Sequence, residues 1–397
     1  MSPYTILIGL SLAVVLSYLF DLAAKATKVP SVLLLLLAGI AFGQATAYWQ
    51  LPVHFPPVLL QILGIVGLIL IVLEGSLDLR LTRDKGPMVR RSFLAAASIL
   101  VVASTAIASL LHFYTGAGWQ SCLANAVALS VVSSAVAIPS VAGLTAEKKE
   151  FIIYESTFSD ILGIMLFNFA LQDNFAQGVS LVTFGADILA VLAVAVLSTA
   201  VLAFLLARLR GHIKFFLLFA FLVLMYSLAK SLHLSSLVLV LVFGLAVNNA
   251  DLFLRGPRLQ RWLHPDELVS ELGQLKSLTA ESAFLVRTFF FLVFGFSINL
   301  ANLLNTHLLW QGLLVVAVLT LIRFVYLRFV ARTDLVPELF IAPKGLISVL
   351  LFYSIPAPLL IGEVSETLMF LVILLTGVLM MVGLQLVPKD VPLEGEV

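Results

Sequence analysis

Long apolar segments follow one another along almost the whole chain. Windows of about 20 mostly apolar residues begin near residues 4, 30, 57, 92, 120, 151, 182, 212, 234, 278, 306, 334 and 364. As an α-helix, a window of this length spans the hydrocarbon core of a bilayer, where every backbone polar group must be paired within the protein. We therefore expect an all-α polytopic membrane protein with about 13 transmembrane helices.

The composition agrees with a protein surrounded by lipid. Only 11% of the 397 residues are charged, whereas a soluble chain carries about 25%, and we expect no nucleic-acid partner. The single cysteine, Cys122, excludes an internal disulfide and a cysteine metal cluster. The first apolar stretch, residues 4–24, lacks a small-residue cleavage site and is predicted to be retained as a helix. The tail after Leu386 is short, so we expect no nucleotide-binding regulatory domain there.

The distribution of basic residues predicts the orientation of the chain. Of the 23 lysines and arginines, 19 fall on one side of the expected spans. Loops on the opposite side, such as residues 44–58 and 112–120, carry almost no charge. By the positive-inside rule, the basic side is cytoplasmic. The N-terminus is then outside and the C-terminus cytoplasmic, as an odd number of spans requires.

Three short motifs of the first half recur, in the same order, in the second half. They pair residues 31–41 with 236–246, residues 75–79 with 295–300, and Pro139 with Pro343. An odd number of spans separates the two members of each pair, which predicts two inverted-topology repeats, an arrangement found in many secondary transporters. The expected organisation is a first repeat over residues 1–180 (helices 1–6), a linker helix over 181–211, a second repeat over 212–388 (helices 8–13) and a cytoplasmic tail over 389–397.

The repeat also indicates where a binding site is expected. Pro139 lies in the middle of the fifth span, and Pro343 and Gly345 interrupt the twelfth. Proline removes a backbone donor and clashes with the preceding turn, whereas glycine tolerates unwound backbone. Interruptions at corresponding positions of two repeats predict broken helices that cross near the middle of the bilayer.

Asp160 stands in the middle of the sixth apolar span, residues 151–171. An ionised carboxylate at that depth costs roughly 2.5–3.5 kcal/mol even on the most lenient scale. A bound proton, a bound cation or a basic partner has to offset that cost. A carboxylate that binds either a proton or a cation is the minimal part of a proton-coupled cation exchanger.

Several serines near this acid are candidate ligands for the transported metal cation. Ser156 precedes Asp160 by four residues and shares its helix face, so these two are the first choice. Ser159 is adjacent in sequence, and Ser133 and Ser134 lie on the facing broken helix. Hydroxyl and carboxylate oxygens suit a small hard cation.

Five other charges lie within or near spans. Glu155 needs a buried partner, and Arg323 in the eleventh span is the expected one, as a structural pair. Lys344 is predicted either to neutralise the ends of the broken helices or to pair with the aspartate. Glu74 ends the third span, where it is expected to line the cytoplasmic approach, and Arg287 is predicted to be a structural charge near the membrane surface.

These motifs together resemble a known family, the monovalent cation:proton antiporters, which include NhaP-type sodium/proton exchangers and KefC-type potassium-efflux proteins. Residues 155–160 are similar to the Glu-Ser-x-Phe-Asn-Asp signature of the sixth helix, and residues 342–345 to the motif of the broken twelfth helix. Residues 37–43 and 73–78 match the second and third helices, and residues 133–137 are closest to the KefC-like version of the fifth-helix motif.

The resemblance implies an NhaA-like fold with roles for named residues. Asp160 would carry the ion or the proton, with Ser156 as a ligand. Glu155 and Arg323 would form a structural pair, and Lys344 would be the basic residue at the helix crossing. The resemblance further implies a homodimer in the bacterial inner membrane, in which spans 4–6 and 11–13 move against the remaining helices.

Two departures from the family pattern bear on the ion and the stoichiometry. Ser159 stands where the family has Asn or a second Asp, and the Thr-Asp pair of sodium exchangers is replaced by small residues around Ser134. With one titratable acid, electroneutral one-for-one exchange is the simpler expectation. Na⁺ is the expected ion, with K⁺ as the other possibility, and no cofactor is expected besides the transported ions.

Three other functions share parts of this sequence pattern. A sodium-coupled organic-anion symporter shares inverted repeats and crossed helices, but it needs a roomy anion site. A channel does not need a buried acid, and an intramembrane hydrolase requires a nucleophile–base pair that Asp160 lacks, so no enzyme is expected. Residues 251–280 are predicted to be a cytoplasmic surface helix or a solvated linker between the repeats.

Overall fold

The computed structural model describes seven main stretches of the chain. They are residues 3–50, 57–78, 85–172, 215–231, 236–248, 265–298 and 305–386, without residues 142 and 334 and with a few isolated positions between them. Helices, but no strands, form within these stretches. The expectation of an all-α chain is therefore confirmed.

The helices follow the expected apolar windows closely. The first half contains α1 (Pro3–Thr27), α2 (Ser31–Tyr48), α3 (Pro57–Asp78), α4 (Gly86–Thr115), α5 (Trp119–Ser130), α6 (Ser134–Ser140) and α7 (Ala146–Ala170). The second half contains α9 (Phe215–Ser231), α10 (Ser236–Asn248), α12 (Pro265–Ser297), α14 (Thr306–Val325), the π-helical turn η2 (Tyr326–Ala331), α15 (Leu346–Tyr353), the 3-10 turn η3 (Ala357–Leu359) and α16 (Glu366–Leu386). In the described part of the chain, seven segments are long and apolar enough to cross a membrane, and two shorter helices are apolar.

Three windows of the sequence need comment. The window that starts near residue 182 lies almost entirely outside the described residues. Helix α12 begins at Pro265, well before the expected start near 278. The sequence predicts a surface helix or a linker over residues 251–280. Residues 265–280 are helical and continuous with the apolar span, so the linker alternative is wrong for them; residues 251–264 are outside the described part.

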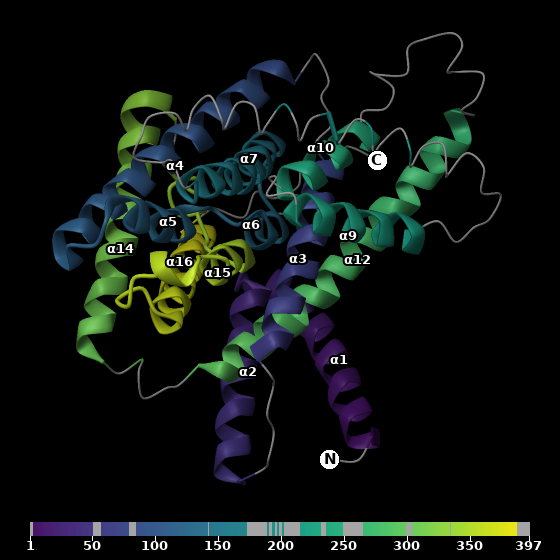
Figure 1. The fold of residues 1–397 in the computed structure, drawn as a ribbon, viewed down its shortest axis with the longest axis horizontal. Helices are drawn as coiled ribbons and strands as arrows, with labels where there is room; N and C mark the ends of the chain where they lie inside the picture. The colour runs from purple at the N-terminus through teal and green to yellow at the C-terminus, as the bar shows by residue number, and fades with distance from the viewer. Residues whose placement is uncertain are drawn as a thin grey trace.

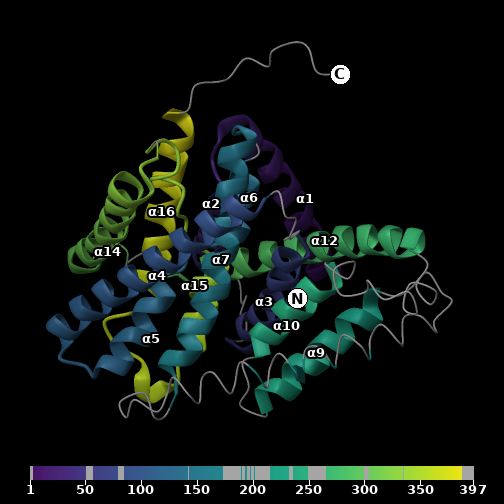
Figure 2. The same ribbon diagram turned by 90° about the horizontal axis from the view of Figure 1, so that it is seen from above.

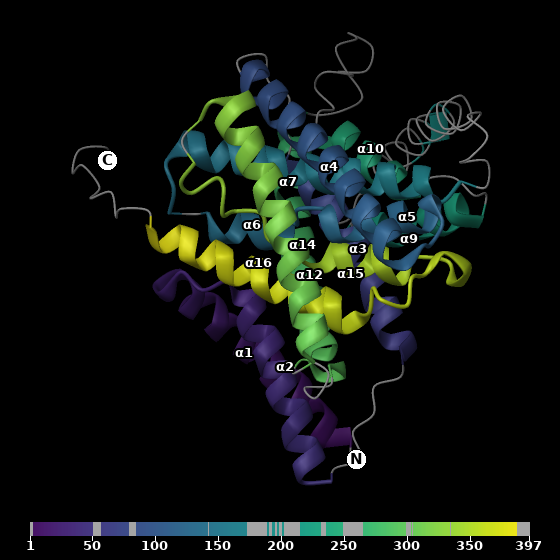
Figure 3. The ribbon, with the colours of Figure 1, turned by 90° about the vertical axis from the view of Figure 1, so that its left-hand side faces the viewer.

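The helices form two groups. In Figures 1 and 2, helices α4, α5, α14 and α16 lie on one side of the molecule, and α1, α3, α9, α10 and α12 lie on the other. Helix α4 packs along α5 and α7, and α14 packs across α16 (Figure 3). In the second group, α2 packs along α12 and α10 packs along α3. The two broken helices lie where these groups meet, since α15 packs against both α3 and α5.

Small residues allow two of these helix pairs to approach closely. A Cβ atom added at Gly39 of α2 would meet backbone atoms of α12, and one at Gly295 of α12 would meet the backbone of α2. In the same way, a Cβ atom at Gly244 of α10 would meet the side chain of Ser76 on α3. The glycines of two motifs that recur in the sequence therefore lie at helix–helix contacts.

Candidate ion-binding site

Two interrupted helices meet at the centre of the site. Helix α5 ends at Ser130, and the chain passes through an extended segment before α6 begins at Ser134. In the second half, the residues before Gly345 are not helical, and α15 begins directly after it. The amide of Ser133 donates a hydrogen bond of 2.9 Å to the carbonyl of Pro343, so the two breaks contact each other. Both spans are interrupted, as predicted; the interruption of the twelfth span includes Pro343, whereas that of the fifth lies at residues 131–133, and Pro139 stands inside α6.

The contact between the breaks depends on a glycine. A Cβ atom at Gly345 would lie 2.6 Å from Ser133 Oγ and 2.7 Å from Val136 Cγ2. Both distances are shorter than real Cβ contacts, so a larger residue would push the two segments apart. Gly345 is needed here for close approach, since its backbone is extended.

Asp160 lies on α7 and points at the first turn of α6. Its side chain is 5% exposed. Asp160 Oδ2 accepts two hydrogen bonds from Ser134, one from the amide (3.1 Å) and one from the hydroxyl (2.5 Å). Asp160 Oδ1 is buried and has no hydrogen-bond partner among the described residues. One carboxylate oxygen is thus fixed, and the other is open to a proton or a cation.

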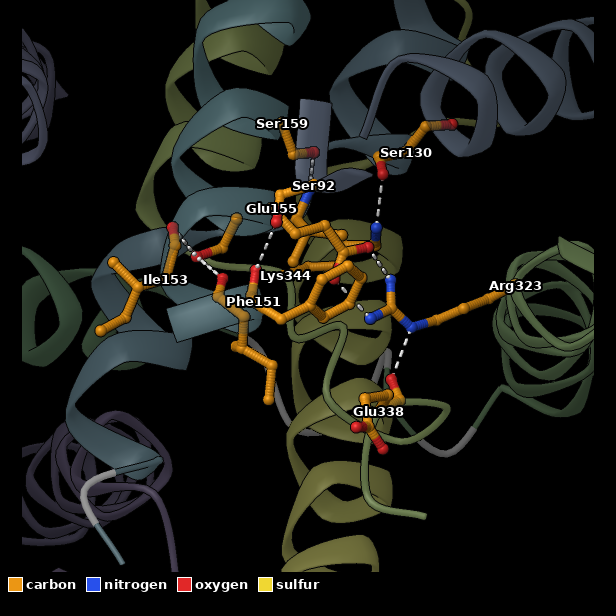
Figure 4. Close-up of polar contacts among 12 residues, drawn as sticks. Ser92, Ser130, Phe151, Ile153, Glu155, Ser159, Arg323, Glu338 and Lys344 are labelled. Atoms are coloured by element: carbon orange, nitrogen blue, oxygen red, sulfur yellow. Dashed lines mark hydrogen bonds and ion pairs between the residues drawn. The ribbon is translucent and has the colours of Figure 1, made fainter. Parts of the chain in front are cut away.

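Lys344 meets the other end of the same break. Its Nζ donates a hydrogen bond of 2.5 Å to the carbonyl of Ser130, the last residue of α5 (Figure 4). In a continuous helix, the amide of Ser134 would donate to that carbonyl, four residues earlier. At the break, Asp160 binds the amide and Lys344 binds the carbonyl. Two buried charges of opposite sign therefore replace one backbone hydrogen bond, and Lys344 takes the first of its two predicted positions, at a helix end.

The candidate serines differ in what their hydroxyl groups do. Ser134 is the serine that contacts the carboxylate. Ser156, the first choice from the sequence, donates its hydroxyl proton to carbonyls of its own preceding turn. Ser159 Oγ accepts a 3.0 Å hydrogen bond from the amide of Val132 (Figure 4), and Ser133 bonds to the second break through its amide. Ser134 is therefore the serine whose hydroxyl bonds to Asp160, and the choice of Ser156 as the first ion ligand stays a prediction.

Glu155 and Arg323 form the buried ion pair that was expected between them. Arg323 Nη1 and Nη2 donate to Glu155 Oε1 and Oε2 at 2.5 and 2.7 Å, in a two-pronged arrangement. The side chains are 1% and 3% exposed. Arg323 Nε also donates to the backbone carbonyl of Glu338 at 2.7 Å, which fixes the guanidinium plane (Figure 4).

Comparisons with known proteins agree with this geometry. The sequence model of the family described as "Sodium/hydrogen exchanger, transmembrane" matches residues 10–388. The chain belongs to this family. Its helices are the membrane spans of a multi-pass transporter, as the sequence predicts. No curated protein gives a significant sequence match.

Two solved structures of a sodium proton antiporter, MjNhaP1 from Methanocaldococcus jannaschii, have the same fold as this exchanger. The structure at pH 8 has a TM-score of 0.68 at 20% identity and covers 96% of this chain and 100% of that one. The electron-microscopy structure has a TM-score of 0.69 at 18% identity and covers 99% and 100%. At these identities the likeness establishes the antiporter fold and no individual residue role.

Arg287 of this exchanger makes a contact that was not predicted. Its Nη1 donates a hydrogen bond of 2.9 Å to the carbonyl of Ala135 in α6, one residue after Ser134. The acidic groups whose charges act on Arg287 are Glu74 on α3 and Asp21 on α1. Arg287 therefore reaches the broken helix, and its location near the membrane surface stays a prediction. Glu74, expected along the cytoplasmic approach, lies close enough to act on the same arginine.

A small cavity of about 20 Å³ lies beside the two buried cations of the exchanger. Its polar lining is provided by Ser130, Thr320, Arg323, Lys344 and Thr376. A space of this size with several polar neighbours has room for one water molecule. The Thr376 hydroxyl also accepts a 3.1 Å hydrogen bond from the amide of Lys344, which holds the second break in place.

Proposed function

We propose that this exchanger moves a monovalent cation and protons in opposite directions by competition at Asp160. The observation that carries the proposal is the asymmetry of the carboxylate. Oδ2 is held by Ser134, while the buried Oδ1 has no partner among the described residues. An ionised carboxylate left in this state is unfavourable at bilayer depth, so the site favours a proton or a cation at Oδ1.

Because the proton and the cation compete for Asp160 Oδ1, the transport of one ion is coupled to the transport of the other. The proton-bound and the cation-bound forms of Asp160 are both neutral, so either can face the other side of the membrane at low cost. The empty form carries a charge and is disfavoured inside the protein. Ser134 keeps the carboxylate oriented through both loaded forms, and the hydroxyl oxygens of Ser156, Ser159 and Ser133 are the further candidate ligands.

The stoichiometry follows from the number of titratable acids at the site. Asp160 is one acid, and Glu155 is occupied by Arg323. One-for-one, electroneutral exchange is the arrangement that such a site supports. Na⁺ is the favoured ion, because the family and the solved structures of similar fold belong to sodium/proton exchangers, and K⁺ is the alternative.

The proposal includes the larger organisation of the protein. Two inverted repeats over residues 1–180 and 212–388 are supported by two equivalent helix pairs, α2 with α12 and α10 with α3. The helices that carry Asp160 and Lys344 would move as a unit against the others. The protein would be a homodimer in a bacterial inner membrane, with the N-terminus outside and the C-terminus in the cytoplasm.

The test is ion-driven proton movement in proteoliposomes that contain purified protein and a pH-sensitive dye. Pulses of Na⁺, K⁺ and Li⁺ are compared with and without a clamp on the membrane potential. We expect a response to Na⁺ or K⁺ that the clamp does not change. Asp160→Asn should abolish the response, while Glu281→Gln, which removes an exposed acid on α12, should not.

Two results would contradict the proposal. Ion-driven proton movement at the wild-type rate in Asp160→Asn would show that another group carries the ions. Na⁺-driven uptake of an organic anion without proton movement would identify a symporter instead.

A further inference from the structure

Helix α6 contains a carbonyl group that has no donor in its own helix. In an α-helix, the amide of residue i donates to the carbonyl of residue i−4. The residue four positions after Ala135 is Pro139, which lies inside α6 and has no amide hydrogen. Ala135 is 7% exposed. A buried carbonyl of this kind is unfavourable unless another group donates to it.

Arg287 supplies that donor. Its Nη1 lies 2.9 Å from the Ala135 carbonyl oxygen and comes from α12, 152 residues further along the chain. The arginine therefore takes the place of the amide that Pro139 removes. The negative charges of Glu74 and Asp21, which lie on two other helices, act on its guanidinium.

The position of this bond links it to the ion site. Ala135 directly follows Ser134, whose amide and hydroxyl hold Asp160 Oδ2. The first turn of α6 thus carries both bonds, one to the arginine and one to the aspartate. If the Ala135 carbonyl lost its donor, this turn would rearrange to find another, and the Ser134 groups would move away from the carboxylate.

We propose that Arg287 is a positioning residue for cation/proton exchange, which acts by replacing the backbone donor missing at Pro139 and thereby holds Ser134 against Asp160. This inference rests on the proposed function of Asp160. It assigns to Arg287 a role in the geometry of the site, without contact with the transported ion.

A double-mutant cycle tests the proposal, because the missing donor can be restored. Arg287→Met removes the guanidinium donor, and Pro139→Ala returns an amide hydrogen four residues after Ala135. We expect Arg287→Met to slow exchange about tenfold, which corresponds to about 1.4 kcal/mol, and to raise the cation concentration at half-maximal rate. The double variant should recover most of the lost rate, whereas independent effects would add.

Two further variants separate a loss of the donor from a loss of folding. Arg287→Lys keeps a charged donor and should retain most of the activity. Arg328→Met, which removes an exposed arginine on η2, should behave as the wild type. If the double variant is as slow as Arg287→Met, the arginine acts through its charge or its packing, and the proposal is wrong.

Hydrogen–deuterium exchange of the α6 segment provides a readout that does not depend on transport. Arg287→Met should increase deuterium uptake over residues 134–140, and the added Pro139→Ala should reverse the increase at the amides common to both proteins. If deuterium uptake follows this pattern but the wild-type protein exchanges no cation, the proposed function is wrong and the contact between Arg287 and α6 is still supported. Unchanged uptake in Arg287→Met would overturn the positioning role.

Discussion

Removing Glu155 should destabilise the protein far more than removing the whole Glu155–Arg323 pair. The single change Glu155→Leu leaves the guanidinium of Arg323 without its two carboxylate acceptors. The Arg323 side chain is only 1% exposed. Breaking a buried ion pair from one side costs about 3–5 kcal/mol. The Glu155 charge also acts on Lys344, so the single change also takes one of its acidic neighbours from the lysine. We expect a loss near the upper end of that range.

The double change Glu155→Leu with Arg323→Met removes both charges at once. Replacing a buried pair with apolar residues of similar volume is often neutral or stabilising. One cost remains, because Arg323 Nε also donates to the Glu338 carbonyl, and a buried acceptor left without a partner costs about 1–3 kcal/mol. The double variant should therefore be about 3 kcal/mol more stable than the single variant, although it carries more substitutions.

The assay is reversible unfolding in mixed micelles, followed by intrinsic tryptophan fluorescence as the proportion of denaturing detergent rises. Glu150→Gln is the matched control. It breaks the Lys85–Glu150 pair, whose side chains are 39% and 37% exposed, and pairs of that exposure contribute about 1 kcal/mol or less.

Two outcomes would refute this reasoning. A loss below about 1 kcal/mol in Glu155→Leu would show that the pair is solvated like a surface pair. A double variant no more stable than the single variant would show that the carboxylate stabilises something besides the arginine. If the double variant folds well and exchanges no cations, Glu155 has a transport role that the structural interpretation does not include.

The remaining predictions concern the contacts around the breaks. Gly345→Ala should lower the free energy of unfolding by about 1–3 kcal/mol, as overpacking does, because the added Cβ would lie 2.6 Å from Ser133 Oγ. The control is Gly362→Ala, where nothing lies within 4 Å of the added atom. It should leave both unfolding and exchange unchanged. Ser134→Ala removes a hydroxyl that donates to Asp160 Oδ2 and should slow proteoliposome exchange more than Ser156→Ala, whose hydroxyl proton is bonded to its own turn. The reverse order of the two serine variants would restore Ser156 as the principal ligand.

The sequence predicts the spans and their interruptions well, because both depend on local chemistry. A window of about 20 apolar residues needs no tertiary information to be recognised as a membrane helix. A proline removes a backbone donor wherever it stands, so the interruption at Pro343 follows from the residue type, whereas the break at residues 131–133 lies before Pro139, which stands inside α6. Helix α12 begins at Pro265, before the apolar window that starts near residue 278. The first half of this helix is polar, so a search for apolar windows does not detect it.

The choice among the serines could not be made from local chemistry. Helix periodicity correctly puts Ser156 on the same face as Asp160. A serine inside a membrane helix, however, has a carbonyl of its own preceding turn within reach, and Ser156 uses it. Ser134 begins a half-helix, where the hydroxyl and the amide both point at an acid on another helix. That acid is 26 residues away in sequence, and only the packing of α6 against α7 brings the two together.

The buried charges around the site share one physical origin that a sequence can reveal in part. Without water in the bilayer core, each backbone group freed by a break needs a partner from the protein. The break after Ser130 frees the Ser130 carbonyl, which Lys344 binds, and the Ser134 amide, which Asp160 binds. It also frees the amides of Val132 and Ser133, which donate to the Ser159 hydroxyl and to the Pro343 carbonyl. The proline at 139 frees a further carbonyl, which Arg287 binds. Two of the freed carbonyls thus bind basic side chains, and one of the freed amides binds an acidic one. A proline inside a predicted span therefore indicates that a donor from another helix is needed four residues earlier, and Arg287 was one of few such donors among the expected spans.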